Sequence, residues 1–367
     1  MMWSALDERI YSHSYSTKTP RVWYSLDEMR QLCGAILLFY GVPILCMAVH
    51  PALSQYFGPF TSFFLDGLIS GQPTLPNLSG LFFDGLIVYL ALLAAFPKRS
   101  LTKDRLLSMY HTVMVTIVTR KRPVLSDAEQ VTWRLYLLKL FFLPLMLSFW
   151  FYQIGQLDRH AGTLSALLFG GEGFILTLIL FLVSALFLID VTFFVFGYLT
   201  ESKYLHNIVH SVDPTISGWF ICLICYPPIN VLTVGAIGGF YGVGVITGPV
   251  YVWLPVSIIG LVALSIYALA SVDLFGRASN LTYRGLVTWG TYSVVRHPAY
   301  ASKLCSWIVA SLPFVVYEPW LLLTIVGWSV IYILRALAEE RHIKMVARSE
   351  YEAYERQVPW RFIPRVI

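Results

Sequence analysis

Long apolar runs separated by short polar segments make up most of the chain. A helix that crosses a bilayer needs about 20 apolar residues at a rise of about 1.5 Å each. By this criterion the pattern predicts an all-α fold, a polytopic transmembrane helix bundle of about eight spans whose last two form a C-terminal helical hairpin. The expected spans are 31–50, 80–96, 135–155, 173–199, 217–239, 247–270, 300–316 and 319–337.

The distribution of Lys and Arg predicts the orientation of these spans. Basic residues are concentrated in 98–122, between the second and third spans, whereas 51–79 contains none. Because cytoplasmic loops are enriched in Lys and Arg, 98–122 is expected in the cytoplasm, and alternation along the chain places both termini there as well. Residues 1–30 are polar, so no cleavable signal peptide is expected. The expected location is the inner membrane of a bacterium, or the endoplasmic reticulum if the source is eukaryotic.

Two further segments are apolar without forming a simple span. Residues 51–75 are interrupted by Pro59 and Asp66, which favours an interfacial or re-entrant segment. Residues 104–122 show helical periodicity and end in Arg-Lys-Arg, which indicates an amphipathic helix at the cytoplasmic membrane surface.

Composition supports the same class of protein. The chain of 367 residues is 57% hydrophobic and 13% charged, whereas soluble domains carry about 25% charged residues. A soluble, disordered or collagen-like protein is therefore excluded. The net charge of +5 resides in a few loops, which is consistent with membrane topology, and no nucleic acid partner is expected. The histidines are mostly scattered, and the pair His206 and His210 is interpreted as solvated or structural, so no metal is expected.

One acidic residue, Asp190, lies inside an expected span. An ionisable group at membrane depth is a functional candidate. Two interpretations remain open: Asp190 has a functional role, or it simply pairs with a neighbouring residue near the end of its span.

Candidate chemistry is concentrated near the C-terminus, beginning with Arg296, His297 and Pro298. Proline is favoured in the first turn of a helix because its missing N–H has no partner there. Pro298 thus predicts a helix start, with His297 at or next to the N-cap. A helix N-terminus flanked by Arg and His is suited to bind an anionic group.

A second group of polar residues follows the helical hairpin. Arg335 and Glu339 are four residues apart and share one helix face, whereas Glu340 points elsewhere. Taken alone, the pair is also explained as an ion pair on the protein surface.

Together these motifs resemble the integral-membrane methyltransferases of the isoprenylcysteine carboxyl methyltransferase and phospholipid methyltransferase group. The resemblance covers about the last 95 residues, whereas residues 1–215 resemble no known family. The chain is accordingly divided into an N-terminal membrane region, 1–215, and a C-terminal methyltransferase-like membrane domain, 216–367. The matching residues are Leu286-Val287-Thr288, Gly290, Tyr292, Arg296-His297-Pro298-x-Tyr300, Glu339-Glu340-Arg341, Glu350-Tyr351-x-x-Tyr354, Val358-Pro359 and Ile363-Pro364.

The resemblance implies a cytoplasmic pocket for S-adenosyl-L-methionine. It implies cofactor contacts for Leu286, Val287, Tyr292, His297, Pro298, Ala299, Tyr300 and Glu339. It also implies that Arg335 faces the methyl acceptor, so Arg335 and Glu339 are the candidate catalytic residues. In place of the His-x-Leu-Val often found in carboxyl methyltransferases, this chain has Arg284-Gly285-Leu286-Val287.

The expected partners are membrane lipid and a hydrophobic or lipid-like acceptor, most simply a carboxylate. A carboxylate acceptor needs orientation and no general base, and an arginine supplies that orientation by bidentate contact. An amine or thiol acceptor would need a base, for which Glu340, Asp190 and His342 are the candidates. Two other classes of protein remain open: an NADPH-dependent sterol or steroid reductase, and a non-enzymatic membrane protein that retains the fold.

Overall fold

The computed structural model describes residues 25–41, 101–120, 124–167, 171–245 and 249–366. Its chain divides into two compact units, Met1–Pro123 and Val124–Ile367. The expected span 80–96, the second part of the span 31–50 (residues 42–50) and the interfacial segment 51–75 lie outside the described residues.

The described part of the first unit contains two packed α-helices. The first, α2 (Leu26–Ile36), begins at a capping box formed by Ser25 and Glu28 and continues into the short π-helix η1 (Leu37–Gly41). The second, α6 (Leu101–Thr119), confirms the helix predicted for 104–122. Helix α2 packs on α6, where Gly34 lies against the ring of Tyr110.

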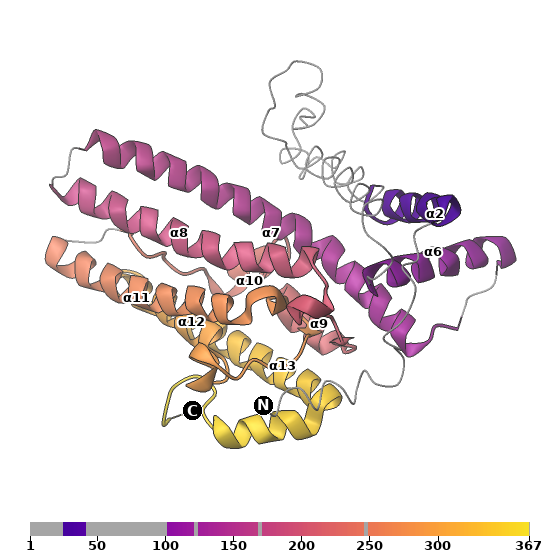
Figure 1. Ribbon diagram of the computed structural model, residues 1–367. Coiled ribbons are helices and arrows are strands. Elements are labelled where there is room, and N and C mark those ends of the chain that lie inside the picture. Colours follow the sequence, from indigo (N-terminus) through magenta and orange to yellow (C-terminus); the bar gives the residue numbers. More distant parts are fainter. Residues whose placement is uncertain (1–24, 42–100, 121–123, 168–170, 246–248, 367) are drawn as a thin grey trace, which may run out of the picture. The chain divides into compact units, whose positions relative to one another are not determined.

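The second unit is built around long apolar helices that lie side by side (Figure 1). Helices α7 (Asp127–Ala166), α8 (Gly171–Leu199), α11 (Val250–Leu274) and α13 (Leu321–Gln357) contain segments long and apolar enough to cross a membrane. They confirm the helices predicted over 135–155, 173–199, 247–270 and 319–337. The protein is therefore an integral membrane protein with a mostly helical fold.

The expected span 217–239 is not one continuous helix. It is divided into α9 (Ile216–Leu223) and α10 (Asn230–Ile237), with Pro227 and Pro228 in the segment between them. Prolines lack the N–H that continues a helical hydrogen-bond ladder, and their rings clash with the preceding turn. The prediction of a single spanning helix here was wrong, although a break at these prolines follows from the same residues.

The C-terminal hairpin has helices of very different lengths. Helix α12 (Pro298–Ser311) continues as the 3-10 helix η6 (Leu312–Phe314) and is shorter than a typical span. Helix α13 is much longer than predicted, with non-helical backbone angles at Ala347 that mark a kink. The count of eight spans is therefore not reproduced in the described residues, where four helices meet the length and hydropathy criteria.

Short elements connect the helices on the side of the bundle where the candidate residues lie. The strands β1 (Ser211–Val212) and β2 (Thr282–Tyr283) pair antiparallel, with Ser211 opposite Tyr283. Three 3-10 helices flank them: η3 (Lys203–Leu205), η4 (Phe275–Arg277) and η5 (Gly290–Ser293). The small sheet ties the loop after α8 to the loop before α12.

Buried aromatic and aliphatic side chains form the core of this unit. Phe142 of α7 stacks on Tyr198 of α8 at 5.7 Å between ring centroids, and Tyr226 meets Phe142 edge-on at 5.0 Å. A second cluster joins α8, α11 and α12 around Trp253 and Leu264. The two clusters hold the membrane helices in place around the polar residues described next.

Candidate active site

A cavity of about 420 Å³ lies within the second unit. Ligand pockets for small molecules range from about 300 to 1,000 Å³, so this cavity is of suitable size. Its walls combine membrane helices with the loop between β2 and α12. Phe149 of α7 and Phe194 of α8 line it together with residues of α9, α11, α12 and α13.

The cavity collects almost all of the residues predicted for the site. Its lining includes Leu286, Val287, Tyr292, His297, Ala299, Tyr300, Arg335 and Glu339. Pro298 is not among the lining residues that the structure describes, and it lies buried as the first residue of α12. Residues from three separate stretches of the sequence therefore meet at one cavity.

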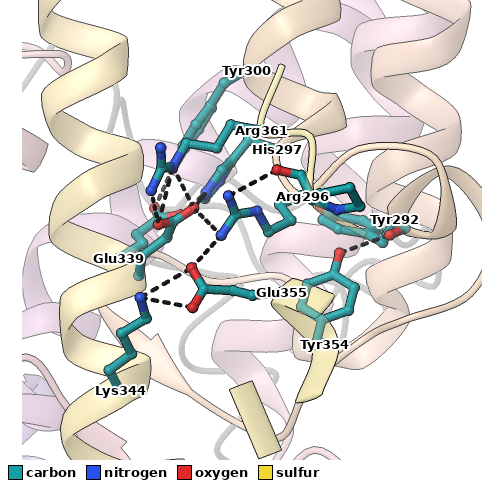
Figure 2. Close-up of polar contacts among 11 residues, drawn as sticks. Tyr292, Arg296, His297, Tyr300, Glu339, Lys344, Tyr354, Glu355 and Arg361 are labelled. Carbon is teal, nitrogen blue, oxygen red and sulfur yellow. Dashed lines mark hydrogen bonds and ion pairs between the residues drawn. The ribbon is translucent and has the colours of Figure 1, made fainter. Parts of the chain in front are cut away.

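The loop from β2 to η5 forms one wall of the cavity. Gly285 adopts a φ of +93°, which residues with a side chain rarely adopt, and this turn places Leu286 and Val287 in the lining. The Asp273 carboxylate accepts hydrogen bonds from the Thr291 backbone N–H and hydroxyl, both at 2.7 Å. Tyr354 donates to the backbone oxygen of Tyr292 at 2.7 Å, which ties this loop to α13 (Figure 2).

Tyr292 itself is a neutral phenol in this setting. Burial raises its pKa well above the usual value, and the nearby Glu339 carboxylate raises it further. Tyr292 therefore keeps its hydroxyl proton and remains available as a hydrogen-bond donor in the cavity.

His297 occupies the N-cap of α12 and Pro298 its first turn, as the sequence predicts. The imidazole stacks in parallel on the ring of Tyr300, with centroids 5.7 Å apart. Its Nε2 lies 3.2 Å from a carboxylate oxygen of Glu340. The ring is thus fixed on both an aromatic face and a charged partner.

Glu340 is the centre of a buried charge network. The Arg361 side chain donates to both of its carboxylate oxygens at 3.1 to 3.2 Å, and Arg296 Nη1 lies 3.2 Å from Oε1. Arg296 and Lys344 in turn both contact Glu355 (Figure 2). Backbone N–H groups of Arg296 and His297 donate to the carbonyls of Trp360 and Arg361. The C-terminal segment is therefore bound to the start of α12.

Arg335 is buried inside the bundle, with its side chain 6% exposed. Its guanidinium donates to Asn280 and to Tyr226, and its Cζ lies 5.0 Å from the centroid of the Tyr300 ring. A guanidinium enclosed in this way is not part of a surface ion pair, so that interpretation of the sequence was wrong. Its Nε is buried and has no hydrogen-bond partner among the residues that the structure describes.

Glu339 lines the cavity on the same helix face as Arg335. The two side chains approach to 3.7 Å, as their spacing predicts, and the Tyr300 hydroxyl donates to Glu339. Glu340 is absent from the described lining and faces the network around Arg361 instead. The adjacent glutamates thus have different surroundings. Glu339 borders the cavity, whereas Glu340 links α13 to the start of α12 and to the C-terminal segment.

Several contributors to the site escaped the sequence analysis. Asn280 and Tyr226 hold the Arg335 guanidinium, and Lys303 lines the cavity from α12. Asn280 and Tyr226 belong to different segments from Arg335, so no local spacing reveals them. Lys303 carried a usable signal, because a lysine in an otherwise apolar helix segment is costly unless it has a function or a partner.

Part of this region matches a known protein family. Residues 240–348 match the family model of phospholipid methyltransferases. The chain has no significant match among curated proteins or among solved structures. The matched region contains the helix start at His297, the cavity residues of α12 and both Arg335 and Glu339. The C-terminal region is thus similar to the phospholipid methyltransferase family, which confirms the resemblance that its motifs indicated.

Proposed function

We propose that the protein is an integral-membrane methyltransferase that uses S-adenosyl-L-methionine and acts on a lipid-like acceptor, most simply a carboxylate. The supporting observation is the cavity in which His297, Tyr300, Glu339 and Arg335 lie together. Residues of the same region match phospholipid methyltransferases. A lipid-like acceptor also agrees with a cavity whose walls include membrane helices.

The residues of the cavity suit such a donor. The Glu339 carboxylate and the ring of Tyr300 offer negative charge and a π-face to a positively charged nucleoside-bearing molecule. The backbone turn at Gly285 and the Tyr292 hydroxyl offer further polar contacts. In this proposal Leu286, Val287, Tyr292, His297, Ala299, Tyr300 and Glu339 bind the donor, and Pro298 supports them as the first residue of α12.

Arg335 is proposed to orient the acceptor. S-adenosyl-L-methionine, when bound, supplies an activated methyl group on a sulfonium sulfur. Transfer of that methyl group to a carboxylate oxygen would leave a neutral thioether and would transfer no proton, so the protein would need to orient the acceptor and would need no general base. The guanidinium, held by Asn280 and Tyr226, contacts the acceptor carboxylate through donors such as its Nε, which makes no hydrogen bond among the described residues. The protein contributes position and exclusion of water.

The same proposal assigns a role to each region of the chain and an orientation of the protein in the membrane. Residues 216–367 would form the methyltransferase-like domain, and 1–215 would contribute the acceptor side, to which Phe149 and Phe194 of the cavity belong. Both termini would be cytoplasmic, so that the donor enters from the cytoplasm and the acceptor from the lipid. The membrane would be the inner membrane in a bacterium or the endoplasmic reticulum in a eukaryote.

Ligand-dependent stability tests the donor class. A ligand that binds only the folded state raises the thermal midpoint. S-adenosylhomocysteine should therefore stabilise the purified protein in detergent, and NADPH should not. Stabilisation by NADPH alone would exclude the methyltransferase and favour a reductase.

A further inference from the structure

A second polar cluster lies on the membrane-helix side of the cavity. Asp190 of α8 is buried and accepts hydrogen bonds from the hydroxyls of Tyr267 and Ser271, both on α11. The ammonium of Lys303 on α12 donates to the same Tyr267 hydroxyl at 3.3 Å. The Tyr267 hydroxyl therefore joins the two charged groups.

The arrangement presents only the positive group to the cavity. Lys303, Tyr267 and Ser271 line the cavity, whereas Asp190 is absent from its described lining. Among the described residues, Asp190 and Lys303 form no direct ion pair. A purely structural pair would gain most from direct contact in this low-dielectric setting. Here the carboxylate lies behind two hydroxyls, and it balances the charge without enclosing the ammonium.

Lys303 also has hydrogen-bonding capacity to spare. An ammonium has three N–H donors, and the described residues provide one acceptor, Tyr267. On its other sides the group lies over aromatic rings, 4.8 Å from the centroid of Tyr267 and 5.2 Å from that of Trp307. Ring faces stabilise a cation but do not accept its remaining strong hydrogen bonds.

The charge of the cavity suits an anionic ligand. Basic side chains outnumber acidic ones in its lining. The acidic residues are Asp213 and Glu339, and the basic ones are Arg277, Arg284, Arg296, Lys303 and Arg335. Arg296 is engaged by Glu340 and Glu355, whereas Lys303 has no carboxylate in direct contact among the described residues.

We propose that Lys303 is an anion-binding residue of the acceptor site, and that the acceptor is an amphiphile whose anionic group, a carboxylate or a phosphate, contacts the Lys303 ammonium. Asp190 and Tyr267 position that ammonium, and Trp307 supports it. This inference rests on the proposed function, since it names the substrate class of the same cavity. If the anion is a carboxylate, it is the methyl acceptor itself, and if it is a phosphate, it anchors an acceptor group elsewhere on the molecule.

Binding of brominated lipids to the full-length protein in an uncharged detergent tests the subsite. Bromine quenches tryptophan fluorescence at short range, and Trp307 lies beside Lys303. The probes are a dibrominated stearate, a dibrominated octadecyl phosphate and the corresponding uncharged alcohol. A saturable quenching component that Trp307→Phe removes is expected for at least one of the two anions, and the stronger of them identifies the anionic group.

Variants of Lys303 decide the assignment. Lys303→Met should raise the half-saturating concentration of the anion by at least about tenfold, because a charge-assisted hydrogen bond is lost. Lys303→Arg keeps the positive charge and should retain most of the anion binding. Lys303→Gln removes the charge and should weaken anion binding as Lys303→Met does. The control is Arg159→Met, which removes one exposed positive charge from α7 and should bind as the unmodified protein does. Binding of the alcohol should be the same in all of them.

Parallel measurements separate this inference from the proposed function. Unchanged anion binding in both Lys303→Met and Lys303→Gln would overturn the subsite, even where S-adenosylhomocysteine still stabilises the protein. Conversely, Lys303-dependent anion binding without any stabilisation by S-adenosylhomocysteine would retain the subsite and reject the methyltransferase. Stabilisation of a Lys303 variant by S-adenosylhomocysteine also shows that the variant is folded.

Discussion

The guanidinium of Arg361 donates to both carboxylate oxygens of Glu340, at 3.1 and 3.2 Å. This contact joins the C-terminal segment to α13 directly behind the residues that line the cavity. The same carboxylate meets His297, so the position of the imidazole depends on a residue near the end of the chain. The relation between Arg361 and Glu340 therefore links the stability of the C-terminal segment to the geometry of the candidate site.

Arg361→Ala should destabilise the protein. The Glu340 side chain is 4% exposed and the Arg361 side chain 36% exposed, so the loss is smaller than for a fully buried pair. We expect the free energy of unfolding to fall by about 1–2 kcal/mol, measured as a lower thermal midpoint in detergent. The matched control is Arg348→Ala, which breaks the exposed Arg348–Glu352 pair and should leave the thermal midpoint nearly unchanged. Equal effects of the two changes would show that the C-terminal contact is not structural.

The adjacent glutamates should respond differently to loss of charge. Glu339→Gln should weaken binding of S-adenosylhomocysteine and leave the thermal midpoint of the free protein nearly unchanged, because Glu339 borders the cavity. Glu340→Gln should lower the free energy of unfolding by about 2–4 kcal/mol, because it leaves buried cations without their partner. Titration of the ligand and thermal unfolding of both variants measure these effects. If Glu340→Gln alone impaired ligand binding while remaining stable, the cofactor role would belong to Glu340.

Arg335→Lys should impair use of the acceptor more than binding of the donor. Lysine retains the charge but lacks the planar guanidinium, whose Nη2 donates to both Asn280 and Tyr226. We expect kcat/KM for the acceptor to fall at least about tenfold, with the affinity for S-adenosylhomocysteine nearly unchanged. Arg341→Lys is the control, since this exposed residue on the same helix contacts only Thr215 and Ser217 in the described structure. Equal acceptor kinetics in both variants would contradict the role of Arg335.

The orientation in the membrane is also testable. Because Lys and Arg are concentrated in 98–122 and absent from 51–79, reporter fusions after Arg122 and after Lys203 should report the cytoplasm. A fusion near Gln72, outside the described residues, should report the opposite side. Signals from the same side for Arg122 and Gln72 would refute the predicted topology.

The sequence by itself determined the class of protein and the identity of most candidate residues. An apolar run long enough to cross a bilayer predicts a helix, because in lipid each backbone N–H and C=O group must form its hydrogen bond within the segment. This reasoning located α7, α8, α11 and α13. It also placed His297 at the start of α12, because the preference of proline for the first turn is a local property. The pairing of Arg335 with Glu339 followed equally from local helical spacing.

Only the tertiary structure decided what surrounds those residues. The break between α9 and α10 depends on packing as well as on the two prolines, since membrane helices also tolerate proline. The burial of Arg335 depends on Asn280, which is 55 positions away in the sequence. The hydrogen bond between Asp190 and Tyr267 spans 77 positions, and it showed that Asp190 is paired with a residue of another helix. Helical periodicity describes neighbours within a few turns, whereas a cavity is formed by side chains that meet only when separate helices pack together.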